Sequence, residues 1–107
     1  MENILRLNPV YNVIIGELLV PEWELFAFDR GDWEIQKPFT LWTEERYLPK
    51  IMKDIGLIPS YSELRRNKPQ YNITLNKPDF IEIKWGKRPL WIAVGVNKEE
   101  LNRYYDD

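Results

Sequence analysis

The sequence predicts an α+β fold in a single domain, with an N-terminal antiparallel β region, a short helix pair and a C-terminal β-hairpin. Segments rich in β-branched and aromatic residues occupy the first 45 residues and return after residue 79, which is typical of strands. Between them, apolar residues recur at helical spacing from Tyr47 to Ile55. The 107 residues contain no repeat or flexible linker, so we expect one domain with a modest core.

Residues 1–45 form the predicted β region. Residues 11–20 are apolar and β-branched, as expected of a strand. Residues 23–28 and 33–39 flank the sequence Asp-Arg-Gly-Asp, in which Gly31 supplies the positive φ of a hairpin turn. Apolar and polar residues alternate in the second arm, so this sheet is expected to be antiparallel and half-exposed.

Two short helices are predicted next. The first covers about residues 48–55, with Pro49 in its first turn, where the missing N–H costs nothing, and a glycine after its last residue. The second covers about residues 60–67. Ser60 and Glu63 have the spacing of an N-terminal capping box, and a proline two residues beyond the helix stops it.

The remaining segments are predicted to alternate between strands and turns. They are, in order, an extended stretch (71–75), a turn (76–79), a strand (80–85), a hairpin turn (86–88) and a second strand (90–96). Trp91 lies in the alternating run of the second strand and is assigned to the core. Asn97 and Glu100 have the spacing of a helix cap, which predicts a short helix within residues 96–107.

Charge is divided unevenly along the chain, although the net charge is only −2. Residues 1–45 carry three basic and nine acidic side chains, whereas residues 46–95 carry ten basic and four acidic ones. Residues 96–107 add a net −2. Because local potential steers binding more than total charge does, the basic segment is the expected contact region for an anionic partner. Attraction between the two halves within the fold is the alternative explanation.

Several classes of function are excluded by composition. The chain has no Cys and no His, so disulfides, the usual zinc sites and Ser-His or Cys-His nucleophile pairs are absent. No cofactor, metal or catalytic residue is predicted, apart from the nuclease-like pattern described below as an alternative. The first twenty residues lack a signal-peptide pattern, and no apolar run reaches the roughly 20 residues that cross a bilayer. We therefore expect a cytoplasmic protein without membrane attachment.

The two predicted helices carry a family resemblance. Residues 47–66 comprise a predicted helix, the link Gly-Leu-Ile-Pro and the run Ser-Tyr-Ser-Glu-Leu-Arg-Arg. This arrangement resembles the helix-pair core of S4-type RNA-binding domains. Residues 83–94 are similar to the glycine-containing hairpin that closes that fold. The likeness covers about residues 46–95, the basic segment. It departs from the family at residues 67–70, where Asn-Lys-Pro-Gln breaks the second helix early.

The resemblance implies RNA binding through the second helix and the loop after it. Arg65 and Arg66 lie side by side in that helix, and adjacent arginines suit phosphate groups. Phosphate contacts are expected from Ser60, Arg65, Arg66 and Lys68, extended by Lys84, Lys87 and Arg88, with Tyr61 and Trp85 stacking on unpaired bases. The expected function is non-catalytic binding of structured RNA, with DNA as the second choice.

Two alternatives remain open. Trp23, Trp33 and Trp42 stand among acidic residues and suit a protein interface, as in a small phage-type interaction or inhibitor protein; the same rings also suit a homodimer. Residues 78–84, Pro-Asp-Phe-Ile-Glu-Ile-Lys, resemble the Pro-Asp…Glu-x-Lys pattern of metal-dependent nucleases, in which Asp79 and Glu82 would hold Mg²⁺. A cross-strand charge pair is the simpler interpretation of this second pattern.

Overall fold

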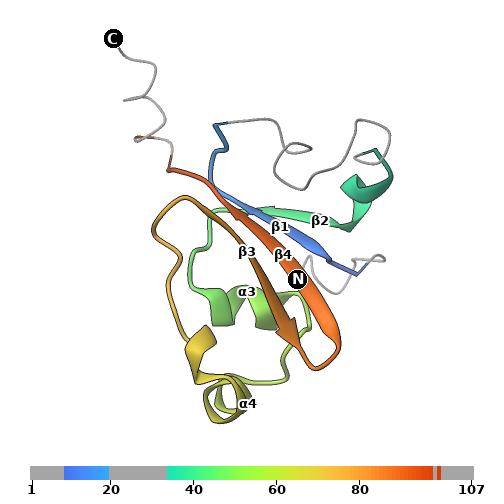
Figure 1. Cartoon of the computed structure of the whole chain (residues 1–107), viewed down its shortest axis with the longest axis vertical. Coiled ribbons are helices and arrows are strands. Elements are labelled where there is room, and N and C mark those ends of the chain that lie inside the picture. Colours follow the sequence, from blue (N-terminus) through green and yellow to red (C-terminus); the bar gives the residue numbers. More distant parts are fainter. Residues whose placement is uncertain (1–8, 20–33, 98, 100–107) are drawn as a thin grey trace.

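A four-stranded mixed sheet forms the centre of the protein (Figure 1). The computed structural model describes residues 9–19, 34–97 and 99. The strand order is β2-β1-β4-β3, and the strands are β1 (Asn12–Ile15), β2 (Thr40–Thr43), β3 (Asp79–Trp85) and β4 (Arg88–Val94). β1 is parallel to both β2 and β4, whereas β3 and β4 form an antiparallel hairpin. The predicted α+β class with its C-terminal strand pair is confirmed.

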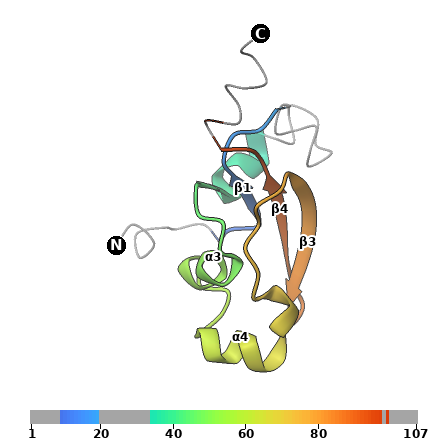
Figure 2. The same cartoon turned by 90° about the vertical axis from the view of Figure 1, so that its left-hand side faces the viewer.

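The predicted helix pair is also present. α3 spans Leu48–Asp54 with Pro49 in its first turn, and α4 spans Tyr61–Asn67 with Ser60 as its N-cap. Figure 2 shows α3 beside one face of the sheet and α4 below it, toward the end where the β3–β4 hairpin turns. A single turn of 3-10 helix, η3 (Pro69–Tyr71), then leads to β3.

The hydrophobic core lies between the sheet and the helices. Alternate residues of β1 and β4 face α3, so that Val13, Ile15 and Ile92 are almost completely buried. The core also contains Leu48, Ile51 and Met52 of α3, Leu64 of α4, Ile83, Leu90 and Val94 of the hairpin, and Val10, Leu57, Ile58 and Leu75 outside these elements. Because α4 contributes only one fully buried residue, most of its surface remains available for other contacts.

The N-terminal β region differs from the predicted antiparallel sheet. β1 and β2 are parallel, because the chain between them is long enough for a crossover instead of a tight hairpin. Residues 34–36 are helical and Lys37–Phe39 form the 3-10 turn η2, so the predicted arm 33–39 is wrong over these residues. Pro38 lacks the N–H that a ladder needs, and its fixed φ suits the start of a helical turn. The other arm and the turn at 29–32 lie outside the described residues.

Three smaller predictions also need correction. The first strand ends at Ile15, because Gly16 has a φ of 73° and turns the chain. Tyr71 belongs to η3 and not to an extended stretch, and only Thr74 of that stretch forms a bridge, with Tyr47. Trp91 is not in the core: Leu90 and Ile92 take the core side of β4, so Trp91 faces away from the helices and is 37% exposed.

Two further predictions concern the end of the chain and the membrane. The predicted C-terminal helix in 96–107 lies almost wholly outside the described residues. None of the helices in the described part of the chain combines the length and the apolar character needed to cross a membrane.

Candidate nucleic-acid interface

The local sequence of α4 determines which of its side chains are available for binding. Ser60 Oγ accepts the backbone N–H of Glu63 at 3.2 Å, which fixes the start of the helix as predicted. Leu64 is buried and holds one face of α4 against the core. Arg65 and Arg66, the next two residues, are exposed.

The two arginines differ in their surroundings. Arg66 forms an ion pair with Glu63 one turn earlier in α4. No acidic partner for Arg65 is found within the described part of the chain. An exposed i,i+3 pair contributes little stability and opens readily, so both guanidinium groups can reach an anion.

Tyr71 joins α4 to the β3–β4 hairpin. The ammonium of Lys68, at the end of α4, lies 6.0 Å from the centroid of the Tyr71 ring. The backbone N–H of Lys84 donates a hydrogen bond to the Tyr71 hydroxyl at 3.1 Å. Basic residues 16 positions apart in sequence are thus brought to the same end of the molecule. The exposed or half-exposed cations Arg65, Arg66, Lys68, Lys84 and Lys87 are called the basic end below.

Arg88 has a structural contact that the sequence did not indicate. Its guanidinium donates to the carbonyl of Val10 at 2.7 Å and lies 5.6 Å from the centroid of the Tyr11 ring. This contact joins the hairpin to a segment 78 residues away. Arg88 therefore anchors the start of β1, whereas Lys87, in the turn beside it, is exposed.

The two aromatic residues predicted to stack on bases are both half-buried and make contacts within the fold. Tyr61 is half-buried, with the Lys53 ammonium 5.4 Å from its ring centroid and the Tyr47 ring 6.3 Å away. Trp85 is half-buried and packs against the hydrophobic core. Of the acidic-region tryptophans, Trp42 lies in β2 and is 46% exposed, whereas Trp23 and Trp33 lie outside the described residues.

Of the five cations of the basic end, only Arg66 has an acidic partner among the described residues, and Lys50 of the neighbouring helix α3 is also paired. Lys50 is paired with Asp54 at 3.0 Å, and that hydrogen bond and the carboxylate charge raise the pKa of Lys50 above its ordinary value. Among the described residues, Arg65, Lys68, Lys84 and Lys87 have no ion pair. This leaves a local excess of positive charge on α4 and the β3–β4 hairpin, which Tyr71 of η3 links. Lys77 precedes β3 and so lies at the opposite end of the sheet.

The residues of the nuclease pattern do not gather at one point. Asp79 and Glu82 are three positions apart in β3, so the pleat directs their side chains to opposite faces of the sheet. The Asp79 carboxylate accepts the backbone N–H of Phe80 at 2.8 Å. Within residues 9–19, 34–97 and 99, no cluster of three potential metal ligands is found.

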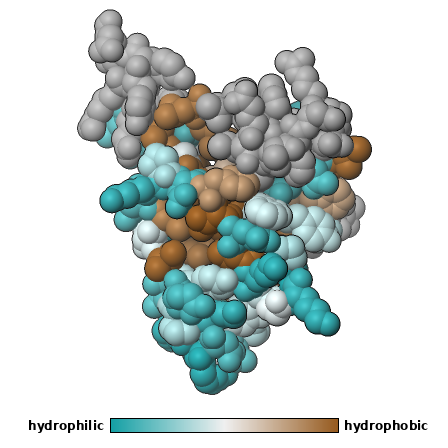
Figure 3. All heavy atoms as spheres, in the orientation of Figure 1, coloured by the Kyte–Doolittle hydropathy of each residue, from teal (hydrophilic) through white to brown (hydrophobic). Residues whose placement is uncertain are grey.

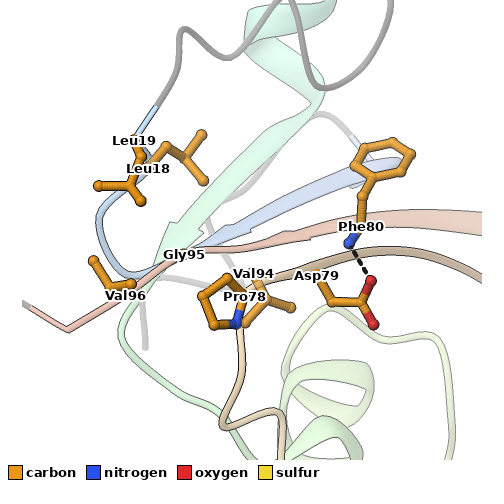
Figure 4. Close-up of a pocket in the computed structure, with 8 residues that line it drawn as sticks. All are labelled: Leu18, Leu19, Pro78, Asp79, Phe80, Val94, Gly95 and Val96. Atoms are coloured by element: carbon orange, nitrogen blue, oxygen red, sulfur yellow. Dashed lines mark hydrogen bonds between the residues drawn. The ribbon is translucent and has the colours of Figure 1, made fainter. Parts of the chain in front are cut away.

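A shallow apolar pocket lies at the other end of the sheet (Figure 4). Its volume is about 290 Å³, and it is lined by Leu18, Leu19, Pro78, Asp79, Phe80, Val94, Gly95 and Val96. Among the described residues that line it, Asp79 has the only ionisable side chain, and its carboxylate accepts the Phe80 N–H, as Figure 4 shows. The pocket therefore offers few groups that would orient a polar ligand.

Comparison with protein families, with curated proteins and with solved structures finds no match to this chain.

Substitution of Ser60 by alanine is expected to lower the free energy of unfolding by about 1 kcal/mol, because it removes the side-chain cap of α4. Urea denaturation monitored by circular dichroism measures this loss. Ser62→Ala is the matched control, since Ser62 is exposed two positions later in the same helix and is not its cap. Equal effects of the two substitutions would contradict the capping role.

Proposed function

We propose that the protein is a non-catalytic RNA-binding protein that holds the phosphate backbone with its basic end. The observation that carries the proposal is the convergence of α4 and the β3–β4 hairpin at Tyr71. Tyr71 contacts the Lys68 ammonium and the backbone N–H of Lys84. Arg65 is in α4 and Lys87 is in the hairpin turn, and none of the four cations has an acidic partner among the described residues. The resemblance of residues 46–95 to S4-type domains supports the same assignment.

Phosphate is the group that this arrangement suits best. Cations on two neighbouring elements can follow a charged backbone, and each phosphate contact releases condensed counterions. Arginine adds a planar fork that matches phosphate oxygens, while lysine acts as a point charge. The elements are held by the core and by the Tyr71 contacts, so the backbone positions that carry the cations have a fixed spacing. Fixed spacing favours base-paired RNA, which holds its phosphates at regular positions.

The expected result for Arg65→Gln/Lys87→Gln is about tenfold weaker binding to an RNA hairpin, because two phosphate contacts are lost. Fluorescence anisotropy of labelled RNA between about 50 and 200 mM salt measures the affinity and its salt dependence. The slope of log affinity against log salt should fall by about two in magnitude, about one for each cation.

The matched control is Lys37→Gln/Lys77→Gln, which removes the same charge from two exposed residues that are not part of the basic end, Lys37 being paired with Glu34. It should leave RNA affinity nearly unchanged. The proposal fails if the protein does not bind RNA hairpins at about 50 mM salt. It also fails if the control variant weakens binding as much as the Arg65/Lys87 variant does, since the net charge would then matter and not its location.

Binding of a protein partner is the second candidate. It is favoured by two tryptophans that lie on the sheet face opposite the helices, Trp42 at 46% and Trp91 at 37% exposure. Aromatic residues of this kind dominate interface energetics. Absence of RNA binding at low salt would make this the better supported function.

A further inference from the structure

The sheet face opposite α3 and α4, called the outer sheet face here, meets the basic end at its lower edge. Figure 1 looks onto this face, with α3 behind the strands. In the same view, Figure 3 shows apolar residues over the middle of the sheet and hydrophilic ones below it, over α4. The pleat places Phe80, Glu82 and Lys84 of β3 and Trp91 of β4 on this face. Lys84 therefore belongs both to the basic end and to the outer sheet face.

Trp91 is held in place as an exposed ring on this face. Its ring stacks on that of Phe80, with centroids 5.9 Å apart and an angle of 24° between the planes. Phe80 is the only ring found in contact with it among the described residues. Trp91 is 37% exposed although its neighbours in β4 are buried. A large ring that is supported from one side and exposed to solvent is a surface on which another flat ring can stack.

Two charged groups flank Trp91. Glu82 lies directly opposite it in the β3–β4 register, and Lys84 lies one pleat further along, opposite Pro89. Directly opposed side chains on an antiparallel pair are close neighbours. Glu82 is exposed, and it has no ion pair or hydrogen bond within the described part of the chain. The Trp91 ring thus has a carboxylate acceptor directly across from it and a cation diagonal to it, on the side of the basic end.

We propose that Trp91 is a stacking platform for an unpaired base of the bound RNA, an inference that rests on the proposed function above. The Glu82 carboxylate accepts hydrogen bonds from the base edge, and Lys84 contacts the adjoining phosphate. A carboxylate accepts two adjacent N–H donors, which guanine offers at its Watson–Crick edge. Uracil offers one N–H between two carbonyl oxygens, which the carboxylate repels. The site therefore takes unpaired guanine in preference to uracil.

Three RNAs test the platform by fluorescence anisotropy: a hairpin with guanine in its loop, the same hairpin with uracil there, and a blunt duplex without a loop. Trp91→Leu should weaken binding of the guanine hairpin about tenfold and leave duplex binding unchanged. Trp91→Tyr, which keeps an aromatic face, should restore most of the affinity. Glu82→Gln should reduce the preference for guanine over uracil from about tenfold to about twofold.

Trp42→Leu is the matched control, because it removes an exposed tryptophan from the same face two strands away. It should not change the affinity for either hairpin. Thermal denaturation of each variant ensures that folded proteins are compared. The inference is overturned if Trp91→Leu leaves hairpin binding unchanged while Arg65→Gln/Lys87→Gln still weakens it, a result that retains the proposed function. It is also overturned if Trp91→Leu weakens duplex binding equally. If the protein binds none of the three RNAs, both proposals fail.

Discussion

The free energy of unfolding is expected to fall by about 3 kcal/mol when Gly95 is replaced by alanine. Gly95 follows the last residue of β4, where the chain passes close to the end of β1. A Cβ at this position would collide with the backbone carbonyl of Glu17 and lie 3.1 Å from that of Ile15. Both obstacles are main-chain atoms, so no side-chain rotation can relieve the contact.

Hydrogen bonds hold those main-chain atoms in place. The Gly95 N–H donates to the Ile15 carbonyl at 2.7 Å. Glu17 and Val96 exchange two further backbone hydrogen bonds, of 2.8 and 2.9 Å. Any shift that made room for a methyl group would weaken these bonds. It would therefore weaken the backbone pairing that connects the ends of β1 and β4. The cost therefore includes both overpacking and lost hydrogen bonds.

Gly86→Ala is the control for the Gly95 prediction. Gly86 has a positive φ of 64°, but an added Cβ would meet no atom within 4 Å. Its substitution should cost about 1 kcal/mol, through backbone strain alone. Urea denaturation of both variants gives the comparison. The prediction is wrong if Gly95→Ala lowers the free energy of unfolding no more than Gly86→Ala does. The main chain around Gly95 would then be able to shift and accommodate a methyl group.

The helices could be predicted from the sequence because their signals are local. Pro49 marks the first turn of α3, and Ser60 with Glu63 marks the start of α4, so each boundary is set by neighbouring residues. Strand direction has no such local signal. The alternation of apolar and polar residues along a strand does not reveal whether its partner runs parallel or antiparallel to it. The parallel pairing of β1 with β2 and β4 could therefore not be predicted.

The composition of the candidate site was only partly predictable for the same reason. The charge division located the basic segment and its exposed arginines in α4. It could not show that Arg88 donates to Val10, since that contact joins residues 78 positions apart. Tyr71 was also missed, because its role depends on the Lys84 N–H at the edge of β3. Alternation in 90–96 did indicate that Trp91 lies opposite its neighbours, but not which face of β4 the helices cover.

The role of Arg46 in the structure differs from the role that the charge count suggests. It contributes to the excess of positive charge in residues 46–95, yet its guanidinium is half-buried and bound to the main chain. Nη1 donates to the Leu75 carbonyl at 3.0 Å, and Nη2 donates to the Gly95 carbonyl at 3.2 Å. These two bonds join the loop before β3 to the end of β4. We therefore assign Arg46 to the fold and not to the proposed RNA contact.

Substitution of Arg46 by methionine should lower the free energy of unfolding by about 2 kcal/mol, since two hydrogen bonds from a charged donor are lost. Arg46→Lys should recover only part of this, because an ammonium lacks the planar fork that reaches both carbonyls. Urea denaturation and RNA anisotropy on the same variants separate structural from binding roles. Arg46→Met should reduce stability and, while folded, retain RNA affinity; Arg65→Met should do the reverse. Loss of affinity in folded Arg46→Met without loss of stability would instead make Arg46 an RNA contact.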